Sequence, residues 1–317
     1  MKDTKHKILT LAALTTIAAG VIHLTNRVIV ASSQLKEMLD FSNHNYYNWR
    51  FGKIYYTKKG KGSPLLLIHD TMPGASGYEW SRVEDQLAQE HTVYTLDLLG
   101  CGRSEKAGIT YTNFLFVQII CDFIKNVIKE KTDIIASGFS CSFVTTAAAY
   151  DKESINKIMF INPVSMISLA QTTTKKDKLF KFFIELPIFG TFIYHIIVSR
   201  ETINDFFLDN LYYNPFHVDT VITDAYYESA HKGGYYAKYL YSSMISKYMS
   251  INISHAVKSL DNSIYIVEGE SEPNGGFIVN EYSALNPAIE TSVIAETKHI
   301  PHVEKPEAFL EQVKIFF

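Results

Sequence analysis

The 317-residue sequence predicts an α/β fold in which a mostly parallel central sheet is flanked by helices. Short apolar runs recur along the chain at 65–69, 92–97, 133–137, 157–162, 263–268 and 292–296. Helix-length segments separate several of them, as the crossovers between parallel strands require. The runs are nearly continuous rather than alternating, which is typical of strands that are buried on both faces.

The elements at the start of the sheet follow from local patterns. Two aromatic-rich segments, 46–50 and 53–57, predict strands on either side of Phe51 and Gly52. Helices are expected at 77–89 and 111–129, and the second has apolar residues at helical spacing. Between Pro163 and Asn262 the alternation stops, and a stretch rich in Tyr, Phe and Ile shows no convincing strand.

The N-terminal segment 8–26 contains no Asp, Glu, Lys or Arg and follows Lys2, Lys5 and Lys7. Its length suits one membrane-spanning helix, so we expect an uncleaved anchor followed by a helical linker at 32–42. Arg27 makes a signal peptide a poor fit. The alternative is an N-terminal helix packed on the body of the protein. The positive charges before the segment favour a body on the outer side of the membrane. The cysteine usage favours a reducing compartment, so the sequence leaves open on which side of the membrane the body lies.

Composition narrows the classes of partner. The net charge is −3 and no basic arm is present, which argues against nucleic acid as a partner. The three cysteines Cys101, Cys121 and Cys141 match no zinc or redox spacing, so neither a metal nor a cofactor is expected.

Residues 138–142 read Gly-Phe-Ser-Cys-Ser and stand between an apolar run and a run of small residues. The pattern predicts a strand, a sharp turn and a helix, with Ser140 exposed at the turn as in the G-x-S-x-G nucleophile elbow. Ser142 stands in place of the last glycine. Backbone N–H groups at the start of the helix would stabilise an oxyanion there.

Three further segments carry a resemblance to a known family. Residues 64–70 end in His69-Asp70 after a buried strand, residues 97–104 follow a D-x-x-G-x-G-x-S pattern, and residues 298–309 are similar to G-H-x-x-x-x-E-x-P-E-x-F. With the elbow, these segments resemble the α/β-hydrolase superfamily in its capped serine-hydrolase branch. The resemblance implies a helical cap at 166–260, inserted between core segments 41–165 and 261–317, after an anchor and linker at 1–40.

The resemblance also implies a catalytic triad. Ser140 is the expected nucleophile, His299 its base, and Glu272 the acid, with Glu270 as the alternative acid. His302 is a less attractive base than His299, and a metal site formed by these two histidines is disfavoured by the proline between them.

The oxyanion hole is expected from the backbone N–H groups of Thr71 and Cys141. Asp70 stands where the family has glycine, so its carboxylate must point away or it impairs the hole.

The expected function is hydrolysis of an ester or related acyl bond of an apolar acyl or aromatic substrate, by a carboxylesterase-like or lipase-like enzyme anchored in a membrane. The alternative is a non-catalytic binding or scaffold protein of the same fold at a membrane. Asp70, the uncertain acid and Lys298, which replaces a glycine before His299, favour that alternative.

Overall fold

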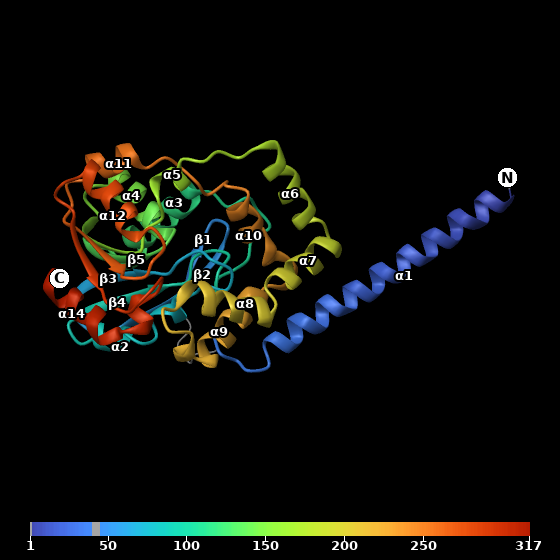
Figure 1. The fold of residues 1–317 in the computed structure, drawn as a ribbon, viewed down its shortest axis with the longest axis horizontal. Coiled ribbons are helices and arrows are strands. Elements are labelled where there is room, and N and C mark those ends of the chain that lie inside the picture. Colours follow the sequence, from blue (N-terminus) through green and yellow to red (C-terminus); the bar gives the residue numbers. More distant parts are fainter. Residues whose placement is uncertain (1, 40–44) are drawn as a thin grey trace.

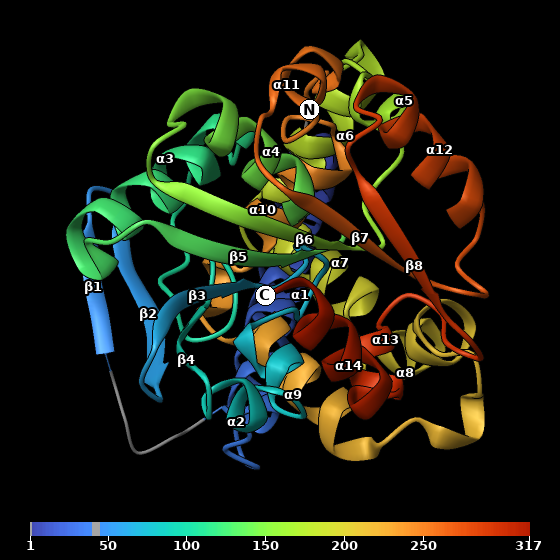
Figure 2. The same cartoon turned by 90° about the vertical axis from the view of Figure 1, so that its left-hand side faces the viewer.

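A computed structural model describes residues 2–39 and 45–317. Within them, strands form one sheet in the order β1-β2-β4-β3-β5-β6-β7-β8 (Figure 2). The strands are β1 (Asn45–Trp49), β2 (Gly52–Lys59), β3 (Ser63–Ile68), β4 (His91–Leu96), β5 (Thr132–Ser137), β6 (Ile155–Ile161), β7 (Ile264–Gly269) and β8 (Glu290–Ile294). β2 pairs antiparallel with β1 and β4, and all other neighbours are parallel. The predicted mostly parallel sheet is confirmed.

Helices cover both faces of this sheet (Figure 2). On one face lie α3 (Asn113–Phe123), α4 (Ser140–Tyr150), α11 (Ser254–Ser259) and α12 (Gly275–Leu285), which share an apolar core with Leu66 and Ile68 of β3. On the other face α2 (Glu84–Leu87) and α14 (Pro306–Phe316) share a core with Leu65 and Leu67. Alternate residues of β3 thus serve two apolar cores, which explains why its sequence is apolar throughout.

One helix predicted next to the sheet is broken in the structure. The segment expected as one helix at 77–89 is a short 3₁₀ turn, Gly77–Trp80, followed by the one-turn helix α2. The helix breaks because Val83 leaves the helical region, with φ −123° and ψ −20°. The expected helix at 111–129 is present as α3, which continues into a π-helical turn, Ile124–Ile128.

Between β6 and β7 the chain forms a helical cap without a strand. Its helices are α5 (Met166–Leu169), α6 (Lys175–Glu185), α7 (Phe189–Ile197), α8 (Arg200–Phe206), α9 (Thr220–His231) and α10 (Lys238–Ile245), with short helical turns at Phe207–Leu211, Pro215–His217 and Gly234–Tyr236. Cap residues such as Tyr194, Phe207 and Tyr226 form a third apolar core. Met72, after β3, and Val303, in α13 (Pro301–Glu304), belong to the same core, so the cap is packed on the loops at the sheet edge.

Helix α1 (Lys2–Ser33) projects away from the body of the molecule (Figure 1). Its segment Thr4–Ser33 is long and apolar enough to cross a membrane, by length and composition. Its C-terminal half reaches the cap, where Asn26 Nδ2 donates to the carbonyl of Ile188 over 3.0 Å. The linker predicted as a helix at 32–42 is a turn after Ser33, and its residues 40–42 lie outside the described part of the chain.

Candidate active site

The loops that follow β3, β5, β7 and β8 meet at one edge of the sheet, because the carboxyl ends of parallel strands lie together. They bring Asp70, Gly138, Glu272 and His299 close to one another. Asn162, after β6, holds the last loop by donating from Nδ2 to the carbonyl oxygens of Lys298 and His299, each over 2.8 Å. The site is therefore assembled from rigid strand ends.

His299 and Glu272 are brought together, as the sequence predicts. Nδ1 of His299 lies 3.0 Å from Oε1 of Glu272. The alternative acid, Glu270, instead accepts the backbone N–H of Glu296 over 2.9 Å. The imidazole is thus oriented by a carboxylate, which is the arrangement that a catalytic histidine needs.

Asp70 points into the site and not away from it. One carboxylate oxygen, Oδ1, accepts the backbone N–H of Thr71 over 2.6 Å and that of Phe139 over 2.8 Å. The other oxygen, Oδ2, lies 3.3 Å from Nε2 of His299. The carboxylate therefore occupies the two N–H groups that would otherwise be free to stabilise an oxyanion, and it faces the second nitrogen of the imidazole.

Ser140 is not brought to His299. Its hydroxyl is fully buried and donates to the carbonyl of His69 over 2.6 Å. The residue at the sharp turn between β5 and α4 is Gly138, with φ +55°, and Ser140 already belongs to the first turn of α4. The turn predicted from the sequence exists, but its apex lies two residues before the predicted serine.

The two N–H groups predicted for the oxyanion hole lie in different surroundings. The N–H of Thr71 points into the site, whereas the N–H of Cys141 donates within the turn to the carbonyl of Gly138, over 3.3 Å. The second N–H at the site belongs to Phe139, the residue that follows the apex. The observed N–H donor precedes the predicted one by two residues, as the observed apex precedes Ser140 by two residues. Both differences arise because the apex of the turn is Gly138.

The charges around His299 decide its protonation. Burial by itself lowers the pKa of this imidazole, but the hydrogen bonds and negative charges of Asp70 and Glu272 outweigh burial and raise its pKa to about 10. At neutral pH His299 is therefore an imidazolium, held between the side chains of Asp70 and Glu272. In that state it can donate a proton but cannot accept one.

His302 has a separate partner below the site. Its Nε2 lies 3.1 Å from Oε1 of the fully buried Glu79, whose other oxygen accepts the N–H of Asp70 over 3.2 Å. Burial favours the neutral carboxyl, but the hydrogen bond and charge of His302 lower the pKa of Glu79 overall. Among residues 2–39 and 45–317, no cluster of His, Cys, Asp and Glu side chains suits a metal ion.

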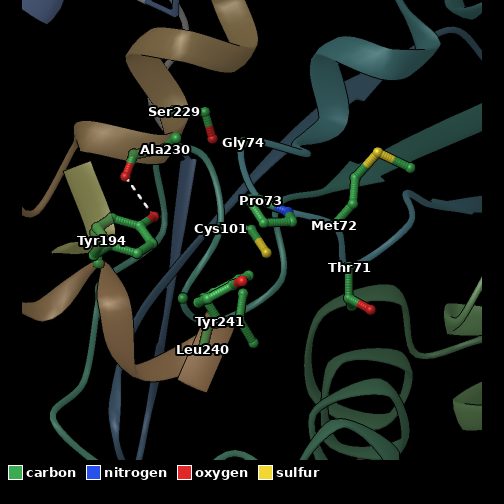
Figure 3. A pocket seen from close by; sticks show the side chains of 12 residues that line it. Thr71, Met72, Pro73, Gly74, Cys101, Tyr194, Ser229, Ala230, Leu240 and Tyr241 are labelled. Carbon is green, nitrogen blue, oxygen red and sulfur yellow. Dashed lines mark hydrogen bonds between the residues drawn. The ribbon is translucent and has the colours of Figure 1, made fainter. Parts of the chain in front are cut away.

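Two hollows adjoin these groups. Glu272 and His299 line an open cleft with Val164, Phe277 and Ile278. A small pocket on the other side lies between Thr71–Gly74 and the cap residues Tyr194, Leu240 and Tyr241 (Figure 3). In Figure 3 the Tyr194 hydroxyl donates to the carbonyl of Ala230 over 2.8 Å, which ties α7 to α9 at the pocket wall.

The fold is that of an α/β-hydrolase, and comparison with known proteins agrees. The model of the alpha/beta hydrolase family matches residues 65–312. The chain therefore belongs to the alpha/beta hydrolase family.

Two curated relatives are hydrolases. The chain is 28% identical over 114 residues to 2-hydroxy-6-oxo-6-(2'-aminophenyl)hexa-2,4-dienoic acid hydrolase of Metapseudomonas resinovorans, covering 35% of this chain and 39% of the relative. It is 29% identical over 109 residues to a soluble epoxide hydrolase of Corynebacterium sp. (strain C12), covering 34% and 37%. The matches thus span well under half of these relatives.

A solved structure extends the likeness to most of the chain. The serine hydrolase involved in carbazole degradation, the CarC enzyme, superimposes with a TM-score of 0.71 at 18% identity, covering 86% of this chain and 98% of that one. At this identity the likeness concerns the fold.

The sequence interpretation did not place Gly138 and Phe139 at the site. Of its two alternatives for Asp70, the structure shows the one in which the carboxylate points into the site. Two signals were available. Residues 136–140 read Ala-Ser-Gly-Phe-Ser, which also has small residues on either side of a turn, with glycine at its centre. The second signal was Asp70 in place of a glycine. Its carboxylate fits beside the turn only if the residue at the apex has no side chain.

Proposed function

We propose that the protein is a hydrolase in which His299, oriented by Glu272, transfers the protons of the reaction. The observation that supports this most directly is the 3.0 Å contact between His299 Nδ1 and Glu272 Oε1, with Nε2 directed at the site. An imidazole held in this way serves general acid–base catalysis on substrates that reach the adjoining cleft.

The substrate proposed is small and apolar, with an acyl or aromatic group. The hollows beside His299 and Thr71 are lined by Phe277, Ile278, Leu240 and Tyr241, which suit such groups. One relative is named as a hydrolase of an aminophenyl dienoic acid and the other as an epoxide hydrolase, and both names are consistent with a small organic substrate.

Cleavage of an ester or acyl bond through Ser140, as in a carboxylesterase or lipase, is a proposal that needs a rearrangement. The Ser140 hydroxyl would have to leave the carbonyl of His69, and the Asp70 carboxylate would have to leave the N–H groups of Thr71 and Phe139. A fluorophosphonate probe tests this route, because it labels an activated serine and leaves an inactive one unlabelled.

The hydrolase proposal itself is tested with His299→Gln and Glu272→Gln. Each should lower turnover of the best of three probes, p-nitrophenyl butyrate, styrene oxide and phenyl acetate, by about 10³-fold or more. His255→Gln, at an exposed histidine, and Glu270→Gln, in the same loop as Glu272, are matched controls that should stay within about twofold. Equal turnover in His299→Gln and the wild-type protein would contradict the proposal.

Attachment to a membrane through α1 is the second part of the proposal. Apolar side chains of α1 are exposed along its length, among them Leu9 at 73%, Leu14 at 60% and Ile17 at 64%. Cap helix α6 exposes Leu179, Phe182 and Phe183 close to Lys175, Lys176 and Lys178, a composition that suits an anionic lipid surface. Lys181 does not belong to that surface, since it is buried and paired with Glu185.

A non-catalytic binding role at a membrane is the alternative, and one observation favours it. The Asp70 carboxylate already accepts both N–H groups that an oxyanion would need. If none of the three probes is turned over and none reacts covalently with the protein, this alternative replaces the hydrolase proposal.

A further inference from the structure

The turn between β5 and α4 has no side chain at its apex. Gly138 has φ +55°, and a Cβ atom on this residue would overlap the Oδ2 and Cγ atoms of Asp70. The Asp70 carboxylate therefore fills the space that a side chain of the apex residue would take. It reaches this space from the loop after β3 rather than from the turn itself.

The two oxygens of this carboxylate have different surroundings. Oδ1 is fixed by the N–H groups of Thr71 and Phe139, at 2.6 and 2.8 Å. Oδ2 faces His299 Nε2 at 3.3 Å. Oδ2 is thus the oxygen with lone pairs to offer, while Oδ1 is held where negative charge is stabilised.

We propose that Asp70 is the nucleophile of this hydrolase and that its substrate class is an epoxide. The inference rests on the proposed hydrolase function and names the bond on which it acts. Because Oδ1 already occupies both N–H donors, no second oxyanion can be stabilised during the attack. The attacked atom is therefore a saturated carbon, at which no oxyanion forms, rather than an ester carbonyl.

The first step forms a bond between Asp70 Oδ2 and the epoxide carbon and breaks the carbon–oxygen bond of the ring. The electron pair of that bond goes to the ring oxygen, which takes the proton from Nε2 of His299. A cationic imidazole at this place provides that proton, and an epoxide oxygen requires one when the ring opens. The products of the step are a hydroxyalkyl ester of Asp70 and a neutral His299.

The second step returns the site to its starting state. Once Asp70 is an ester, its negative charge no longer holds the proton on His299, so the imidazole can accept a proton from water. The hydroxide adds to Cγ, and the charge that develops on Oδ1 meets the N–H groups of Thr71 and Phe139. Collapse breaks the Cγ–Oδ2 bond, and the leaving alkoxide takes the proton of His299 to give a diol. The new carboxylic acid then returns its proton to His299.

The test uses styrene oxide as the probe. In Glu272→Gln, His299 can still supply the first proton, but it is a weaker base for the water of the second step. The ester should therefore accumulate, so the protein gains the mass of one styrene oxide on the peptide that contains Asp70. In the wild-type protein, repeated turnover in H₂¹⁸O should place ¹⁸O in the Asp70 carboxylate. Asp70→Asn should lose diol formation by about 10³-fold or more. Asp209→Asn, at an exposed position, is the control and should stay within about twofold.

Asn at position 70 can still accept the two N–H groups, so folding of Asp70→Asn is checked by its melting temperature. Absence of both the adduct and the ¹⁸O label overturns the inference. If p-nitrophenyl butyrate is turned over in a His299-dependent way while Asp70→Asn keeps that activity, the hydrolase proposal stands and the role of Asp70 is wrong. If His299→Gln changes no activity, the hydrolase proposal is wrong as well.

Discussion

Gly138 is the residue that determines what the site can hold. Its φ is positive, which is unfavourable for residues with a side chain. A side chain at this position would also overlap the Asp70 carboxylate. The single absent side chain separates this site from one built around a serine at the turn.

Gly138→Ala should destabilise the protein by about 1–3 kcal/mol, because the new methyl group meets Asp70 and the backbone stays in a region unfavourable for alanine. Urea unfolding measures the change. Gly276→Ala is the matched control, since nothing lies within 4 Å of its Cβ position, and its helical place in α12 favours alanine by about 0.5–1 kcal/mol. A Gly138→Ala variant as stable as the wild-type protein would show that Asp70 moves away freely.

The double substitution Asp70→Gly with Gly138→Ser should create reactivity toward fluorophosphonates. It empties the N–H groups of Thr71 and Phe139 and places a hydroxyl near the imidazole of His299. The measurement is covalent labelling, followed by peptide mapping. Gly138→Ser alone should remain unlabelled, because Asp70 still occupies the space. Labelling of the wild-type protein at Ser140 would contradict the expected order of reactivity.

At the scale of elements, the sequence predicts the positions of the strands well and the residue at the apex of the turn less well. The ends of all described strands lie within two residues of the predicted ends, since buried parallel strands are apolar runs bounded by polar turns. His299 and Glu272 are predicted correctly as neighbours because each follows a strand at the same sheet edge. The apex of the elbow is predicted at Ser140, but it lies at Gly138. Residues 136–140 and 138–142 both have small residues around a turn, and only the positive φ of Gly138 distinguishes them.

Helix α1 carries the prediction of membrane attachment. Leu14→Lys combined with Ile17→Lys should shift the protein from the membrane fraction to the soluble fraction, because each lysine at the centre of a span costs about 2.5–3.5 kcal/mol. Both positions lie outside the contact with the cap, at 60% and 64% exposure, so the body should remain folded. Leu35→Lys, beyond the end of α1, is the control. Retention of the double variant in the membrane fraction would contradict anchoring by this helix.

At the scale of the whole molecule, His299 couples folding to pH. Its pKa is raised from 6.5 to about 10 in the folded protein, so the folded state binds the proton more tightly than the unfolded state. The stabilisation is fully present below about pH 6.5 and is lost as the pH rises through about 10.

The free energy of unfolding should therefore fall between about pH 6.5 and about pH 9.5 by more in the wild-type protein than in His299→Gln, as measured by urea titration at each pH. His255→Gln, at the surface, should follow the wild-type protein. Parallel curves for the wild-type protein and His299→Gln would mean that the imidazole is not held protonated by Asp70 and Glu272.

The mutual exclusion between positions 70 and 138 also constrains how such a site can arise. A chain with a side chain at both positions is overfilled, whereas a chain with glycine at both has only an empty space between His299 and the turn. A stepwise change between a site with serine at position 138 and the present arrangement would therefore pass through a chain with glycine at both positions. Two loops that lie far apart in the sequence are therefore coupled, and a side chain at one of these positions should go together with glycine at the other.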